Sequence, residues 1–167
     1  MTAPTRTVFS LCLAVLFLLS NSSAASAHFI KTHDTVWEEF GKCAKMTTEI
    51  SHGQGGGFFE AEVAMTKPLS FGPDQIECYR PWEFAPGRLK LRIKILKWDS
   101  AQRKYILCAR STWVTADENA SKLQFDLNFA EPLCGPGAYK SRAVVKFKKN
   151  GVWIKETLDA GPHYLPA

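Results

Sequence analysis

Apolar and polar residues alternate with a period of two through most of the chain. In the clearest run, Arg88 to Ile95, leucines and isoleucines at odd positions alternate with arginines and lysines at even positions. Because successive side chains of a β-strand point to opposite sides of the sheet, this pattern predicts a strand with one buried face. The phase changes after Ile95, at Leu96 and Trp98, which indicates a β-bulge or the end of the strand.

Six further segments follow the strand pattern, and turn residues separate them. Asn150-Gly151 lies between the last two, and it predicts a hairpin because both residues tolerate the positive φ of a type I′ turn. The only helix that the pattern predicts is a short one from Thr35 to Lys45. The six predicted strands are Lys45 to Ser51, Phe58 to Met65, Lys104 to Arg110, Lys122 to Phe129, Lys140 to Phe147 and Val152 to Leu158.

Short strands, frequent turns and an even set of cysteines predict an all-β fold. The architecture we expect is a disulfide-stabilised antiparallel β-sandwich of the immunoglobulin-like kind. A closed β-barrel is the alternative. No internal repeat or long linker divides the sequence, so we expect residues 28–167 to form a single domain.

The first 27 residues have the pattern of an export signal. Arg6 supplies a positive charge, Val8 to Leu19 is apolar apart from Ser10, and Ala25-Ser26-Ala27 is a small-residue cleavage site. The apolar run is shorter than the roughly 18 to 20 residues of a membrane-spanning helix. We therefore expect residues 1–27 to be a signal peptide, His28 to begin the mature chain, and the protein to be secreted, with no transmembrane segment.

Four of the five cysteines lie in the expected mature chain: Cys43, Cys78, Cys108 and Cys134. In an oxidising compartment an even set predicts two disulfides. We expect Cys43 to pair with Cys78 and Cys108 with Cys134, because each pair brackets strand-like segments, although the sequence leaves other pairings open. A zinc site is not favoured, because no two of the cysteines form a C-x-x-C pair.

The net charge is only +5, but many cations are concentrated in two stretches without acidic residues, Arg88 to Lys97 and Lys140 to Lys155. Even-numbered cations in both stretches should point away from the core, and they form one basic surface if the two strands share a sheet. Such a surface attracts anionic polymers, glycans or cell-surface components, and more weakly at high salt. The candidate anion-binding residues are Arg88, Lys90, Arg92, Lys94, Lys140, Arg142, Lys146, Lys148 and Trp153.

Trp153 belongs to this set because an exposed tryptophan can stack on sugar rings. The alternative interpretation of the cations is an ordinary solvated face that keeps the sheet soluble. Nucleic acid is an unlikely partner, because no recognised binding motif is present. No nucleophile elbow or phosphate-binding loop is found either, so we expect a non-enzymatic interaction protein with no catalytic residues and no cofactor.

The expected amino terminus supports a second hypothesis. His28 offers an α-amino group and an imidazole, a nitrogen pair that suits copper(II). This resembles the histidine brace of lytic polysaccharide monooxygenases and the start of some small periplasmic copper carriers. The resemblance implies a copper cofactor and a second histidine close in space, for which His33, His52 and His163 are candidates and Tyr164 an axial group. The alternative function is thus a small extracellular copper-binding protein with His28, His52 and His163 as metal ligands.

Overall fold

The structure is a computed structural model that describes residues 29–39, 42–52, 56–65 and 82–166. The described residues form nine β-strands and no helix. None of them forms a helix that could cross a membrane. The strands are β1 (Phe29–Glu39), β2 (Lys42–His52), β3 (Gly57–Met65), β4 (Leu89–Asp99), β5 (Lys104–Arg110), β6 (Val114–Thr115), β7 (Lys122–Phe129), β8 (Gly137–Lys149) and β9 (Val152–Leu165).

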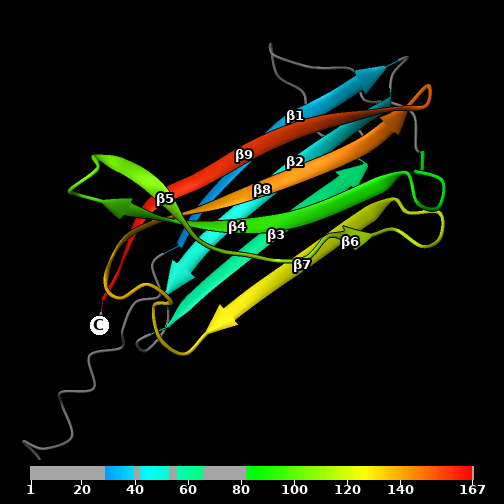
Figure 1. The fold of residues 1–167 in the computed structure, drawn as a ribbon. Helices are drawn as coiled ribbons and strands as arrows, with labels where there is room; N and C mark the ends of the chain where they lie inside the picture. Colours follow the sequence, from blue (N-terminus) through cyan, green and yellow to red (C-terminus); the bar gives the residue numbers. More distant parts are fainter. Residues whose placement is uncertain (1–28, 40–41, 53–55, 66–81, 167) are drawn as a thin grey trace, which may run out of the picture.

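The strands form two antiparallel sheets that pack face to face (Figure 1). One sheet has the order β1-β2-β3-β7, and the other has the order β5-β4-β8-β9, with β6 also paired to β4. At one edge β9 runs beside β1 and β2 of the opposite sheet. The prediction of an all-β, antiparallel fold is therefore confirmed.

The alternating residues that predicted strands form the core between the sheets. Leu89, Leu91, Ile93 and Ile95 of β4 are fully buried, whereas the cations between them are only half-buried. Burying an aliphatic side chain of this size contributes about 1.5 to 3 kcal/mol. The other sheet contributes its inward side chains to the same core, which include Met46, Ile50, Phe59, Ala61 and Val63.

A polar contact also joins the sheets inside the core. Thr48 Oγ1 donates a hydrogen bond of 2.9 Å to the carbonyl oxygen of Glu60. It lies 2.8 Å from Ser141 Oγ on β8, and both side chains are fully buried. Because the Thr48 proton is used on Glu60, Ser141 donates to Thr48. The two hydroxyls satisfy each other in a place where an unpaired polar group would be costly.

Two local predictions are confirmed. Asn150 and Gly151 have positive φ of 49° and 83° and connect β8 to β9 as a tight hairpin. The phase change after Ile95 is a register shift in the pairing of β4 with β5, between Ile95 and Leu96.

The prediction of a helix from Thr35 to Lys45 is wrong. The described residues of this segment belong to β1 and β2, which pair antiparallel along most of their lengths. A register shift between Thr35 and Trp37 interrupts the alternation in β1, which removes the sequence signal for a strand. Backbone pairing with β2 then decides the conformation, since short helices of this kind are marginal without packing.

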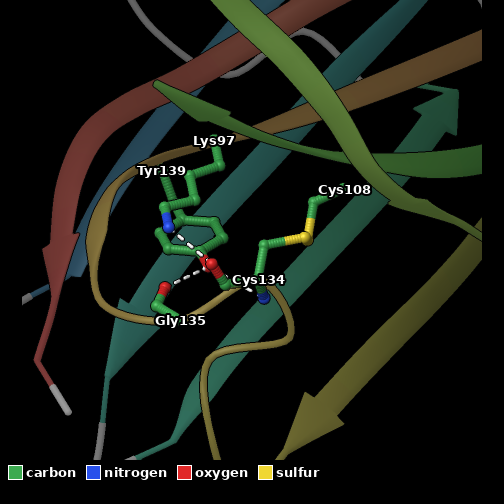
Figure 2. Close-up of a disulfide and its surroundings, with 5 residues drawn as sticks. All are labelled: Lys97, Cys108, Cys134, Gly135 and Tyr139. Atoms are coloured by element: carbon green, nitrogen blue, oxygen red, sulfur yellow. Dashed lines mark hydrogen bonds between the residues drawn. A yellow bond between two sulfur atoms is a disulfide. The ribbon is translucent and has the colours of Figure 1, made fainter. Parts of the chain in front are cut away.

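The loop between β7 and β8 is fixed by three side-chain contacts (Figure 2). Cys108 of β5 and Cys134 of the loop form the predicted disulfide, with a sequence separation of 26. Closing a loop of this length stabilises the fold by about 3 to 4 kcal/mol. Lys97 Nζ donates a hydrogen bond to the carbonyl oxygen of Cys134 at 2.5 Å.

Tyr139 provides the third contact. Its buried hydroxyl donates to the carbonyl oxygen of Gly135 at 2.6 Å and accepts from the amide of Cys134 at 3.2 Å (Figure 2). Burial raises the pKa of this phenol, and the Cys134 amide partly offsets the rise. The hydroxyl therefore stays protonated and holds the loop against the start of β8.

The other predicted disulfide is described only in part. Cys43 of β2 is fully buried and forms a disulfide. Its predicted partner, Cys78, lies outside the described residues.

We predict that Tyr139→Phe lowers the free energy of unfolding by about 1 to 3 kcal/mol, because a buried amide and a carbonyl lose their partner. Urea denaturation at neutral pH measures this loss. Tyr164→Phe is the matched control, since Tyr164 is 63% exposed, and it should change stability by less than about 0.5 kcal/mol. Equal effects of the two substitutions would contradict this role of Tyr139.

Candidate functional site

His52 and His163 meet at one end of the molecule, although 111 residues separate them. His52 is the last residue of β2 and His163 lies near the end of β9, so the two come from opposite sheets. His52 Nδ1 lies 2.5 Å from His163 Nε2, and the ring centroids are 4.7 Å apart. We call these two residues the histidine pair.

The direction of His52 follows from the alternation along β2. Thr48 and Ile50 are fully buried between the sheets, and His52 continues the same even-numbered series. His52 is half-buried because β2 ends here.

The direction of His163 depends on a β-bulge in β9. Ala160 pairs with Ser141 and His163 pairs with Tyr139, so two residues of β9, Gly161 and Pro162, lie opposite the single residue between them on β8. Without the extra residue, position 162 would face the core instead. With it, His163 and Leu165 turn inward and are 8% and 1% exposed.

Glycine is required at the bulge. Gly161 has φ of +107°, a backbone conformation that residues other than glycine rarely adopt. A Cβ at this position would lie 2.7 Å from the carbonyl oxygen of Tyr139. A glycine within a strand pattern is a known sign of a bulge, so this signal was present in the sequence.

The other residues of the predicted metal site lie elsewhere or outside the described residues. His28 is outside them. His33 is exposed on β1, where it pairs with Thr47 on the outward face of its sheet, so it does not join the histidine pair. Tyr164 follows His163 directly but is 63% exposed, as expected for the opposite face of a strand.

The two facing nitrogens of the histidine pair are at hydrogen-bond distance, slightly closer together than two ligands of one metal ion would be. Metal–nitrogen bonds of about 2.0 Å place two ligand nitrogens about 2.8 to 4 Å apart, so small ring rotations would suffice to admit an ion. Within the described part of the chain, no group of three or more histidine, cysteine or acidic residues is assembled. A complete site therefore needs a further ligand.

The candidate anion-binding residues lie on a different surface. The two cationic strands, β4 and β8, pair directly, and Lys90, Arg92 and Lys94 alternate with buried residues, so they point away from the core. Arg142 and Lys146 of β8 lie on the same face. We call this outward side of β5, β4, β8 and β9 the cationic face.

Not all predicted cations take the same position. Lys140 lies 4.6 Å from the centroid of the Tyr105 ring, toward the end of the sheet. Arg88 and Lys148 line a pocket of about 290 Å³ at the end of the molecule where β4 begins and β8 ends. Trp82, Glu83 and Phe84 also line this pocket. Trp153 is 38% exposed, and it pairs with Lys148.

The sequence did not identify two members of the cationic face. Arg110 pairs with Lys94 across β5 and β4. Trp113 precedes β6, and its ring lies 4.3 Å from the Arg92 guanidinium carbon and 5.1 Å from Lys146 Nζ. Strand register decides both positions, and the spacing of residues along the chain does not predict that register.

Comparison of the chain with protein-family models, with curated proteins and with solved structures gives no match.

We predict that Gly161→Ala lowers stability by about 1 to 3 kcal/mol through backbone strain and separates the rings of the histidine pair. Urea denaturation and the nuclear Overhauser contact between the two imidazoles measure these effects. Gly151→Ala is the matched control, because Gly151 also has positive φ but an added Cβ would meet nothing within 4 Å. An unchanged imidazole contact in Gly161→Ala would show that the bulge does not orient His163.

Proposed function

We propose that the protein is exported, begins at His28 after removal of residues 1–27, and binds copper between its amino terminus and the histidine pair. The contact between His52 and His163 carries this proposal. Two imidazoles from opposite sheets meet where a hydrophobic core would otherwise continue to the end of the strands.

The pairing of β1 with β2 supports a contribution from the amino terminus. Phe29 pairs with Ser51, the residue before His52. Residue 28 is covalently bonded to Phe29, and consecutive Cα atoms lie about 3.8 Å apart. A mature chain that starts at His28 would therefore have its α-amino group and a third imidazole within reach of the histidine pair.

The chemistry of these ligands favours copper. An amino group and imidazoles are nitrogen donors, which suit copper(II) in a tetragonal arrangement. At equal geometry copper(II) also binds such sites more tightly than the other divalent metals of the first transition row. Thiolate ligands, which would favour zinc or copper(I), are not offered by Cys108 and Cys134, because they are joined in a disulfide.

The same disulfide supports export. Disulfides persist in oxidising compartments and are rare in the cytosol. This agrees with the signal-like pattern of residues 1–27 and with a mature terminus generated by cleavage. We propose the extracellular space as the location in which the site acquires its metal.

We further propose that the fold is an immunoglobulin-like sandwich in which β1 is added at the edge of one sheet. If β2, β3 and β7 correspond to strands A, B and E, then β4, β8 and β9 correspond to C, F and G, and the observed neighbours agree with that order. Tyr139, near the start of β8, hydrogen-bonds to the backbone just upstream, as does the tyrosine corner of such domains. The added strand, β1, is the one that leads from the amino terminus.

We predict that the mature protein starting at His28 binds one copper(II) ion. His52→Ala and His163→Ala should each weaken copper binding by more than about tenfold. Loss of a residue that only supports a metal ligand already costs roughly 10- to 100-fold in affinity, and these two residues are proposed as ligands. Adding one alanine before His28 should weaken it comparably, since the α-amino group is displaced. Calorimetric titration with a competing chelator measures the affinity, and intact mass spectrometry verifies the terminus.

His33→Ala is the matched control, because it removes an imidazole from the exposed face of β1 and should leave the affinity unchanged. Circular dichroism distinguishes loss of a ligand from loss of the fold, and His163→Gln is a milder variant at that buried position. Copper binding that survives both His52→Ala and the added alanine would refute the proposed site. A native terminus at any residue other than His28 would refute the role of the amino terminus.

A further inference from the structure

We infer that the cationic face binds an anionic polysaccharide, whose carboxylate or sulfate groups contact the cations while its sugar rings stack on Trp153 and Trp113. This inference does not depend on the proposed copper site. The histidine pair lies between the sheets at one end of the molecule, whereas the cationic face is the outward side of one sheet.

Strand register places the cations in rows across the sheet. Lys90, Lys146 and Lys155 lie directly opposite one another on β4, β8 and β9. A second row joins Arg110, Lys94 and Arg142, on β5, β4 and β8. Four residues of strand, or about 13 Å, separate the two rows. Like charges directly opposite each other destabilise a sheet, so this arrangement is costly to the free protein.

Few acidic groups offset these charges. In the described part of the chain, the ion pairs on this face are made by one carboxylate, that of Asp159. Arg142 donates to it through Nε and one terminal nitrogen, at 2.6 and 2.8 Å. Asp159 therefore compensates the end of the arginine-containing row and leaves the lysine row without an ion pair among the described residues.

The environment of Lys94 reflects the accumulated positive charge. Partial burial lowers the pKa of its amino group, and repulsion from neighbouring cations lowers it further; these are Arg92, Lys155, Arg142 and Arg110. A bound polyanion would relieve this repulsion. The face is thus more complementary to an anionic ligand than a surface with interspersed charges of both signs would be.

Two tryptophans give the face an affinity for sugar rings in addition to charge. Trp113 lies between the rows, stacked with Arg92 and near Lys146. Trp153 is partly exposed, and Lys90 Nζ lies 5.2 Å from its ring centroid. Aromatic rings offer an apolar surface to the C–H face of a sugar, while the adjacent cations bind its acidic substituents.

The geometry favours a polysaccharide over other polyanions. Cations lie 4.3 to 5.2 Å from both tryptophan rings and would have to enter the apolar interior of a membrane with them, which is costly. Arg88 and Lys148, joined by a backbone hydrogen bond, lie two residues beyond Lys90 and Lys146 along the chain, and they lengthen the cationic surface that an extended polymer would contact. Nucleic acids can use similar stacking, but the disulfide points to a compartment in which they are scarce.

The test uses the full mature protein in a chelator, so that copper does not contribute. Heparin and polygalacturonate are the anionic probes, and dextran is the neutral probe. We expect both anionic probes to bind and dextran not to bind. The variant Lys90→Gln/Lys155→Gln should bind about tenfold more weakly at low salt, with a salt slope reduced by about one to two. Trp153→Ala should lose roughly five- to tenfold at every salt concentration, because stacking is not screened.

Matched controls separate these effects from net charge and exposed aromatic area. Lys45→Gln/Lys104→Gln removes the same charge from other parts of the surface, and Phe29→Ala removes an exposed aromatic ring from β1, in the opposite sheet. Equal losses in the control and test variants would overturn the inference. Binding of dextran, or equally tight binding of anionic vesicles or single-stranded DNA, would also overturn it. None of these outcomes bears on copper binding, which is measured without polysaccharide.

Discussion

The alternation of side chains along the strands, with its shift at the bulge in β9, determines which residues can meet at the two proposed sites. Alternation places the aliphatic residues of β4 inside and its cations outside. It also directs His52 inward at the end of β2. The bulge at Gly161 and Pro162 then changes the phase by one residue, so that His163 faces the interior. Both proposed sites follow from this one constraint, because the first needs the bulge and the second needs an uninterrupted pattern.

The fold supports two arrangements that would each be costly in isolation. Cations directly opposite each other repel, and polar imidazoles at the end of a core replace apolar packing. The fully buried residues of both sheets, the hydroxyl contact between Thr48 and Ser141, and the disulfide at Cys134 offset these costs. Lys97 and Tyr139 contact the same loop that the disulfide joins to β5, so three strands of one sheet, β5, β4 and β8, hold this loop.

Much of the fold could be predicted from the sequence, because the relevant signals are local. Short segments are enough to predict the β4 strand and the Asn150-Gly151 hairpin. The pairing of Cys108 with Cys134 is one of only three ways to join four cysteines in two disulfides. The strand β1 was missed since its own register shift interrupts the alternation between Thr35 and Trp37. The histidines were candidates from their chemistry alone, but their meeting depends on the bulge. Arg110 and Trp113 were missed because only strand register brings them beside Lys94 and Arg92.

The central claim is that the interior end of the two sheets and the amino terminus together form a nitrogen site for copper. X-ray absorption at the copper edge of the loaded mature protein tests it most directly, because imidazole rings give a characteristic multiple-scattering signal. The account predicts nitrogen ligands at about 2.0 Å, with three imidazoles contributing to the scattering. A spectrum with fewer than three imidazoles, or with sulfur in the first shell, would contradict it.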